Sequence, residues 1–124
     1  MQDGKYVIMV IDDDPDFLTV MRLVLEASGY IMAEAKSAEQ GLKIYKKTNP
    51  DLVLVDLMME EIDSGTSFAK ELRLVGNKAP VYLLSAAGDE MADNIDYAQL
   101  GFAGVFQKPI ENHRLLSVIK TKLK

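Results

Sequence analysis

Residues 6–18 read YVIMVIDDDPDFL, and this stretch contains the transition that decides the fold. An apolar run from Tyr6 to Ile11 ends at three adjacent aspartates, and an apolar-periodic segment begins directly after them. An apolar run of this length is typical of a buried strand. Asp14 followed by Pro15 is typical of a helix start, because Asp caps the first turn and Pro needs no N–H there. The stretch therefore predicts a strand that leads through an acidic loop into a helix.

The same alternation of apolar runs and helical periodicity continues to the end of the chain. Apolar runs rich in β-branched residues predict strands at residues 6–11, 31–35, 52–55, 81–84 and 104–107. Between and after them, apolar residues recur at helical spacing, at Phe17, Met21, Val24 and Leu25; at Leu42 and Tyr45; at Phe68, Leu72 and Val75; at Met91, Ile95 and Ala98; and at Leu115, Leu116, Ile119 and Leu123. Ser37 with Gln40 predicts a capping box at the second helix. Alternation of this kind predicts an α/β domain over residues 1–124, with helices on both faces of a parallel sheet.

Composition narrows the possible classes of protein. The chain has 124 residues, no cysteine and a formal net charge of −5. We therefore expect one compact domain without disulfides or thiolate metal sites, and no direct nucleic-acid binding by this domain. No apolar run approaches the roughly 20 residues that a membrane span needs, and the N-terminus does not read as a secretory signal. A cytoplasmic location is compatible with these features.

Polar residues follow or end four of the predicted strands. Asp12 and Asp13 follow the first strand, Asp56 the third, Ser85 the fourth and Lys108 the fifth. In an open α/β sheet, ligands bind at the carboxyl ends of the strands, so these side chains are expected to share one edge. Crowded carboxylates favour a hard cation such as Mg²⁺, and Lys108 and Ser85 suit an anionic oxygen. The set predicts a pocket for a phosphoryl group, with Asp14 set apart as a helix cap.

The chain resembles the receiver domain of bacterial two-component response regulators, a family that includes the single-domain chemotaxis regulator. The resemblance spans essentially the whole sequence and rests on VIDDDP, PDLVLVDLMM, VYLLSA and FQKPI, in the family's order. It implies a flavodoxin-like five-stranded parallel sheet of order 2-1-3-4-5 with five flanking helices. It also implies a signalling switch rather than an enzyme, one that promotes only its own phosphorylation and dephosphorylation.

The resemblance implies a role for each matching position. Asp56 matches the phosphoacceptor, which takes a phosphoryl group from a sensor histidine kinase or a histidine phosphotransfer protein. Asp12 and Asp13 match the acidic pair that holds Mg²⁺ (or Mn²⁺), with Asp13 the direct ligand, and Asp56 also lies at the metal. Met58 would lend its backbone carbonyl to the metal. Ser85 matches the switch hydroxyl. Lys108 matches the lysine that pairs with the phosphate, and its bond to Pro109 is expected to be cis.

One departure concerns the switch itself. Family members usually carry Tyr or Phe three residues before the lysine, and this chain has Val105 there. The neighbouring Phe106 is expected on the opposite face, because strand side chains alternate. The resemblance implies a downstream protein partner or a further effector domain, but the sequence names neither the kinase nor the output. Homodimerisation through the fourth and fifth helices is common in the family, and no residue here decides it.

The acidic run is open to two other interpretations. A Mg²⁺-dependent phosphohydrolase of haloacid-dehalogenase type would use Asp12 as nucleophile, with Ser85 and Lys108 in its later motifs. That interpretation leaves Asp56 without a role and lacks a later acidic pair. A flavodoxin-type cofactor binder would need a hydroxyl- and glycine-rich first loop, which the sequence does not have. An assay with Mg²⁺ and a small phosphodonor distinguishes the three.

Overall fold

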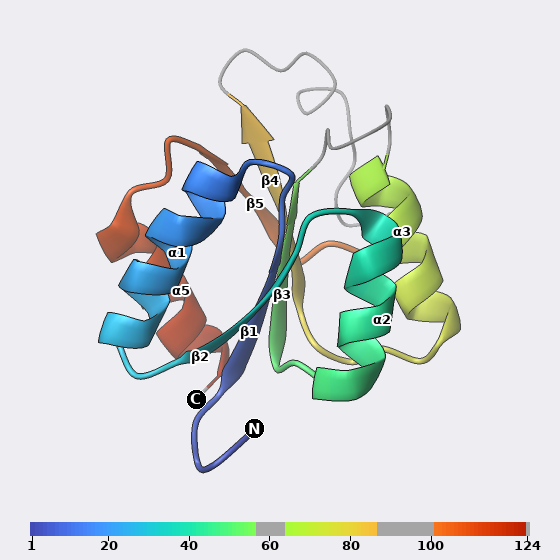
Figure 1. Ribbon diagram of the computed structural model, residues 1–124, viewed down its shortest axis with the longest axis horizontal. Helices are drawn as coiled ribbons and strands as arrows, with labels where there is room; N and C mark the ends of the chain where they lie inside the picture. The colour runs from blue at the N-terminus through green and yellow to red at the C-terminus, as the bar shows by residue number, and fades with distance from the viewer. Residues whose placement is uncertain (57–63, 87–100, 124) are drawn as a thin grey trace.

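The computed structural model describes residues 1–56, 64–86 and 101–123, and within them the chain forms an α/β sandwich (Figure 1). Five parallel strands pair in the order β2-β1-β3-β4-β5. The strands are β1 (Val7–Ile11), β2 (Ile31–Ala35), β3 (Leu52–Asp56), β4 (Val81–Ala86) and β5 (Gly104–Lys108). The described helices are α1 (Pro15–Ala27), α2 (Ala38–Thr48), α3 (Ser64–Leu74) and α5 (Asn112–Lys122). The predicted sheet and strand order are confirmed.

The helices cover both faces of the sheet. Figure 1 shows α1 and α5 on one face and α2 and α3 on the other. The predicted fourth helix, with Met91, Ile95 and Ala98, lies outside the described residues, so four of the five expected helices are described. Among the described residues, no helix is long and apolar enough to cross a membrane.

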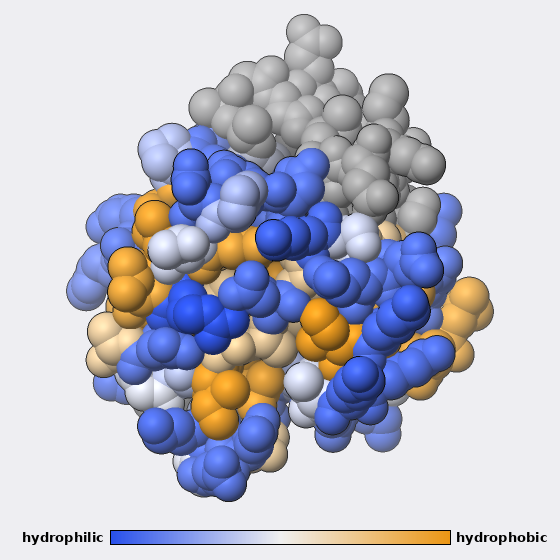
Figure 2. All heavy atoms as spheres, viewed as in Figure 1, coloured by the Kyte–Doolittle hydropathy of each residue, from blue (hydrophilic) through white to orange (hydrophobic). Residues whose placement is uncertain are grey.

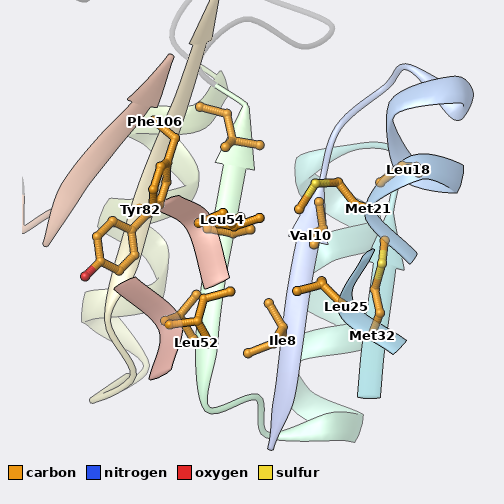
Figure 3. Close-up of a cluster of buried hydrophobic side chains, with 13 residues drawn as sticks. Ile8, Val10, Leu18, Met21, Leu25, Met32, Leu52, Leu54, Tyr82 and Phe106 are labelled. Atoms are coloured by element: carbon orange, nitrogen blue, oxygen red, sulfur yellow. The ribbon is translucent and has the colours of Figure 1, made fainter. Parts of the chain in front are cut away.

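Two apolar clusters pack the helices against the sheet. On the α1 and α5 face, alternate residues of β1 and β3 form one apolar cluster with residues of α1 and α5. Figure 3 labels Ile8, Val10, Leu52, Leu54 and Leu25 of this cluster. The second cluster, on the α2 and α3 face, contains Met9, Ile11, Val53, Val55 and Phe68. Every residue of β1 is buried, because both faces of this strand are covered. This explains why β1 reads as a continuous apolar run rather than an alternating one.

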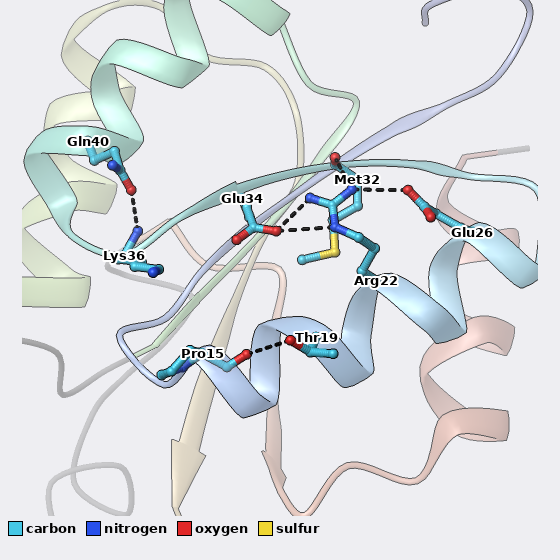
Figure 4. A network of polar contacts seen from close by, with 8 residues as sticks. All are labelled: Pro15, Thr19, Arg22, Glu26, Met32, Glu34, Lys36 and Gln40. Carbon is cyan, nitrogen blue, oxygen red and sulfur yellow. Dashed lines mark hydrogen bonds and ion pairs between the residues drawn. The ribbon is translucent and has the colours of Figure 1, made fainter.

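The first helix begins as the sequence predicts. Asp14 has extended backbone angles and its side chain accepts a hydrogen bond from the Asp16 N–H at 3.0 Å, with Pro15 at the first helical position. Further along α1, the Arg22 guanidinium donates to Glu34 Oε1 on β2 at 2.6 Å and to Glu26 Oε2 at 3.0 Å (Figure 4). The hydrogen bond to Glu34 raises the pKa of Arg22 above its usual value. These contacts fix α1 against the edge strand.

Several details differ from the sequence predictions. β3, β4 and β5 extend past their expected ends to Asp56, Ala86 and Lys108, so the candidate site residues Asp56, Ser85 and Lys108 belong to the strands themselves. In α1, Leu18 is buried, whereas Phe17 and Val24 are only partly buried. Val75 lies beyond the end of α3 and is 52% exposed, because the chain leaves the helix after Leu74.

The capping box of α2 is formed in part. The Gln40 N–H donates to Ser37 Oγ at 3.1 Å, as the box requires. The Gln40 side chain, however, accepts from the N–H of Lys36 at 2.7 Å, one residue before the cap (Figure 4). Both bonds still satisfy backbone donors at the start of the helix.

The face seen in Figure 2 is mainly hydrophilic, with apolar groups scattered between charged ones. The most exposed large apolar residues among those described are Leu74, Leu23 and Met1. Single exposed apolar residues are common on protein surfaces and need no separate explanation.

Candidate functional site

Three carboxylates meet at the carboxyl ends of the neighbouring strands β1 and β3. Asp12 directly follows β1 and Asp56 is the last residue of β3, and the two strands are paired with Ile11 opposite Val55. One carboxylate oxygen each from Asp12, Asp13 and Asp56 lies within 4.8 Å of the others. Asp12 and Asp56 are buried, whereas Asp13 is exposed. The fold thus brings together the three acids that the sequence singled out.

Lys108 brings a positive charge to this group from the edge strand β5. Its Nζ donates to Asp12 Oδ2 at 2.5 Å and lies 3.8 Å from Asp56 Oδ2. The Lys108 side chain is 23% exposed, so part of this side chain remains in contact with water. A single ammonium against three carboxylates leaves the group with formal negative charge.

Asp12 is held by protein donors on both oxygens. Its Oδ1 accepts from the backbone N–H of Asp14 at 2.9 Å, and its Oδ2 accepts from Lys108. Its own N–H donates to the carbonyl of Ala35 on β2 at 3.0 Å. A buried carboxylate needs such partners, because an unpaired buried charge is strongly disfavoured. Asp14 therefore caps α1 with its side chain and orients Asp12 with its backbone.

Ser85 lies on the same edge, on β4. It is 4% exposed and follows Leu84, the residue that pairs with Asp56 across the sheet. The Lys108–Pro109 peptide bond is cis, which confirms that prediction. Met58 lies outside the described residues.

Phe17 reaches the site without having been predicted there. The Lys108 Nζ lies 4.3 Å from the centroid of the Phe17 ring, a cation–π distance. The sequence placed Phe17 only in the apolar stripe of the first helix. The available signal was its place in the first turn after an acidic loop, which puts it beside a strand end, but nothing in the sequence identifies the lysine it meets.

The acids fit a hard divalent cation. Carboxylate oxygens are the ligands that Mg²⁺ prefers, and it commonly takes one or two of them together with water and phosphate oxygens. The spacing of the three oxygens allows one ion to neutralise the group, and no softer nitrogen or sulfur ligand belongs to the group within the described residues. The residues present therefore suit Mg²⁺ better than a transition metal that needs His or Cys.

Comparison with known proteins identifies the family in which this fold and this group of acids occur together. Residues 8–120 match the family model of the response regulator receiver domain. The chain belongs to the response regulator receiver domain family. Receiver domains are phosphorylation-dependent signalling switches and generally bind Mg²⁺ at an acidic pocket. Nothing in these matches favours the phosphohydrolase interpretation.

Curated relatives of this receiver domain are longer proteins. The transcriptional regulatory protein GlrR of Escherichia coli K12 is 33% identical over 116 residues, which cover 94% of this chain and 26% of GlrR. The alkaline phosphatase synthesis transcriptional regulatory protein PhoP of Bacillus subtilis is 31% identical over 117 residues, covering 94% of this chain and 48% of PhoP. This chain spans about a quarter to a half of these relatives.

Solved structures agree on the fold. A response regulator receiver domain protein from Clostridium thermocellum superposes with a TM-score of 0.85 at 26% identity, over 95% of this chain and 94% of that one. The chemotaxis response regulator CheY4 of Vibrio cholerae gives a TM-score of 0.84 at 20% identity, over 97% of this chain and 100% of CheY4. At that identity, the second likeness supports the fold alone.

The receiver departs from its family at Val105, and the structure confirms the predicted orientation of its neighbour. Phe106 belongs to the apolar cluster on the α1 and α5 face, in a tilted pair with Tyr82 at 5.3 Å between ring centroids. Val105 packs against the cluster on the opposite face. The aromatic residue of β5 therefore lies on the face opposite to the one that Val105 occupies.

Proposed function

We propose that this receiver domain accepts a phosphoryl group on Asp56 from the phosphohistidine of a sensor kinase or phosphotransfer protein. The observation that carries this assignment is that Asp56 lies beside the fully buried acid Asp12 and near the ammonium of Lys108. Asp56 ends the central strand β3, its Oδ2 lies 3.8 Å from Lys108 Nζ, and one of its oxygens lies within 4.8 Å of Asp12 and Asp13. Asp12 has both of its carboxylate oxygens engaged by protein donors, which suits a role in holding the site together.

The transfer needs little covalent chemistry from the protein. An Asp56 oxygen forms a bond to phosphorus while the bond between phosphorus and the histidine nitrogen breaks, and the imidazole leaves with the electron pair and takes up a proton. Lys108 and Ser85 would meet the oxygens of the transferred group. Lys108 can do so because its ammonium already lies between Asp12 and Asp56.

Asp12, Asp13 and Asp56 would hold Mg²⁺ (or Mn²⁺), with the Met58 carbonyl as a further ligand outside the described residues. When bound, the ion supplies positive charge that offsets the charge of the acids and of the phosphoryl oxygens. Asp13 suits the role of direct ligand, because it is exposed and its carboxylate lies beside the other two. Asp12 would contribute a carboxylate whose position is already fixed by hydrogen bonds from Asp14 and Lys108.

Phosphorylation adds up to about two negative charges to this edge of the sheet. Ser85 and Lys108 would turn toward the new oxygens, and this movement would select between two packings of the segment around β4 and β5. Val105 is smaller than the aromatic residue usual in the family, so the switch would depend more on Ser85 and the adjoining loop. The output would be a changed surface for a downstream protein or for an effector domain.

Residues 1–124 would act as one receiver unit in the cytoplasm. The relatives named as transcriptional regulators are about two to four times longer, so any DNA binding would belong to a domain other than this receiver. This receiver domain would also form a homodimer, a state that is common in the family.

The test is a phosphorylation assay read by intact mass. The protein is incubated with Mg²⁺ and acetyl phosphate, and we expect it to gain one phosphoryl group while acetate is released. Omission of Mg²⁺ should slow the gain strongly, and Asp56→Asn should abolish it.

Asp12→Asn serves as the matched control, because it removes a neighbouring acid of the same group. A receiver would retain Asp56-dependent phosphorylation at a reduced rate. Steady turnover of donor that survives Asp56→Asn and is lost in Asp12→Asn would instead support the phosphohydrolase and contradict the proposal.

A further inference from the structure

The ring of Phe17, a residue of helix α1, contacts the ammonium of Lys108. Phe17 is partly buried and packs against the apolar cluster on the α1 and α5 face. Its ring centroid lies 4.3 Å from Lys108 Nζ, well inside the roughly 6 Å over which a ring attracts a cation. Within the described part of the chain, the ammonium thus contacts Asp12 at 2.5 Å, Asp56 at 3.8 Å and the ring.

The position of this ring is fixed by the same turn that holds Asp12. Phe17 is the third residue of α1, and the helix start is set by the Asp14 cap and by Pro15. The Asp14 backbone N–H also holds Asp12 Oδ1 at 2.9 Å. One short segment therefore places both the acid and the ring that contact Lys108.

We propose that Phe17 is a positioning residue for phosphoryl transfer, which holds the Lys108 ammonium between Asp12 and the phosphoacceptor Asp56. This inference rests on the proposed function and deepens it. The aromatic ring attracts the cation through its π face but takes up no N–H in a directional hydrogen bond. The remaining ammonium donors are therefore left for Asp12 and for the oxygens of the incoming phosphoryl group.

The ring also covers one side of the ammonium of Lys108, whose side chain is partly exposed. Lys108 and Phe17 line the same groove of about 270 Å³, together with Val20, Pro109 and Ile110. A ring in this place displaces water from the cation, which strengthens its interaction with nearby negative charge. A leucine would cover the ammonium without attracting it, so the two contributions can be separated by substitution.

The experiment compares Phe17→Leu with Phe17→Tyr. Both are incubated with Mg²⁺ and acetyl phosphate, and the rate of mass gain is measured as a function of donor concentration. We expect Phe17→Leu to lower the maximal rate by about threefold to tenfold and Phe17→Tyr, which keeps the ring, to stay within about twofold of wild type. The donor concentration at half-maximal rate should change little, because the ring positions the Lys108 ammonium and does not itself contact the donor. Where the rate does not saturate, the ratio of rate to donor concentration is compared instead.

A second comparison asks whether Phe17 acts through Lys108. In a Lys108→Met background the ammonium is absent, and Phe17→Leu should then change the slow remaining rate by less than about twofold. Acetyl phosphate is used as the donor in place of a protein kinase, so the measured rate does not include any effect of the groove on docking of a protein partner. Val20→Ala is the matched control, because it removes apolar atoms from the same groove and leaves the Phe17 ring in place. This variant should retain the wild-type rate.

Three results would overturn the inference while leaving the proposed function intact. These are an unchanged rate in Phe17→Leu, an equal loss in Phe17→Leu and Phe17→Tyr, and a loss of the same size in the Lys108→Met background. If Lys108→Met takes up no phosphate at all, the leucine and tyrosine variants decide the question. Failure of the wild type to gain phosphate on Asp56 would overturn the proposed function, and the inference with it.

Discussion

Asp12 and Asp13 are adjacent in sequence but differ in their surroundings. Asp12 is fully buried and bonded to Asp14 and Lys108, whereas Asp13 is exposed and lies near two other carboxylates. The three acids repel one another where no cation joins them. Asp13 would therefore contribute repulsion to the metal-free protein and, under the proposed function, a ligand to the metal-bound one.

The first prediction is that Asp13→Asn stabilises the metal-free protein and weakens the stabilisation that Mg²⁺ provides. Without Mg²⁺ the variant should have a free energy of unfolding about 0.5–1 kcal/mol above wild type, because one repelling charge is gone. Mg²⁺ at about ten times its dissociation constant should stabilise the wild type by about 1.4 kcal/mol and the variant by much less. Urea unfolding with and without Mg²⁺ measures both. Equal stabilisation of the two proteins by Mg²⁺ would remove Asp13 from the metal site.

The burial of Tyr82 leads to a second prediction, which concerns stability at high pH. It is 4% exposed, and burial raises the pKa of its hydroxyl above the usual value near 10. Its neutral form is therefore favoured by folding, so this contribution to stability is complete below about pH 10. It is lost as the pH rises above that value, because the unfolded chain releases the proton first.

We accordingly predict that Tyr82→Phe makes the protein less sensitive to alkali. The difference in unfolding free energy between about pH 8 and pH 11, measured with urea, should be smaller in the variant than in wild type. Burial also raises the pKa of Tyr45, so part of the alkaline loss should remain in the variant. An identical pH dependence in both proteins would show that Tyr82 does not contribute.

At the level of elements, the approach of α2 to the sheet depends on Gly41. A Cβ at this position would lie 2.9 Å from Ile11 Cδ1 and 3.1 Å from Phe68 Cε1. Both neighbours are fully buried in the cluster on the α2 and α3 face, so a shift of either one must be accommodated within packed side chains. Glycine is a poor helix former, and its use here follows from this close contact.

The third prediction is that Gly41→Ala destabilises the protein although alanine favours helix. Overpacking typically costs about 1–3 kcal/mol, and the gain in helix propensity returns up to about 1 kcal/mol. We expect a net loss of about 1 kcal/mol in the free energy of unfolding, measured by urea denaturation.

Ile11→Val provides the compensating change, because it removes the Cδ1 atom that lies closest to the added methyl group. The double variant Gly41→Ala, Ile11→Val should be more stable than the sum of the two single effects predicts. Strict additivity would contradict the packing explanation.

For the molecule as a whole, the sequence was sufficient to predict the sheet. The strand order, the cap at Asp14 and the gathering of Asp12, Asp13, Asp56 and Lys108 follow from periodicity, from the rule for strand ends and from the family resemblance. The strands and the helix cap depend on local pattern, and the rule for strand ends brings the polar residues to one end of the sheet, whereas the strand order was implied by the resemblance.

Contacts between side chains of distant elements could not be predicted in the same way. The Phe17 ring on Lys108 joins the first helix to the last strand, and periodicity says only that Phe17 faces inward. The two hydrogen bonds that Asp12 accepts, from the Asp14 N–H and from Lys108, likewise depend on how the edge strand β5 meets the loop after β1. The far end of α3 was misjudged at Val75, because an apolar residue next to a turn can continue the period without being buried.

The central claim is that folding makes Asp56, and not Asp12 or Asp13, the acid that accepts phosphate. The most direct measurement treats the protein with Mg²⁺ and acetyl phosphate, reduces the acyl phosphate with borohydride to homoserine and locates the modified residue by peptide mass spectrometry. We predict homoserine at position 56 alone, dependent on Mg²⁺. Homoserine at position 12 or 13, or none at position 56, would contradict this assignment.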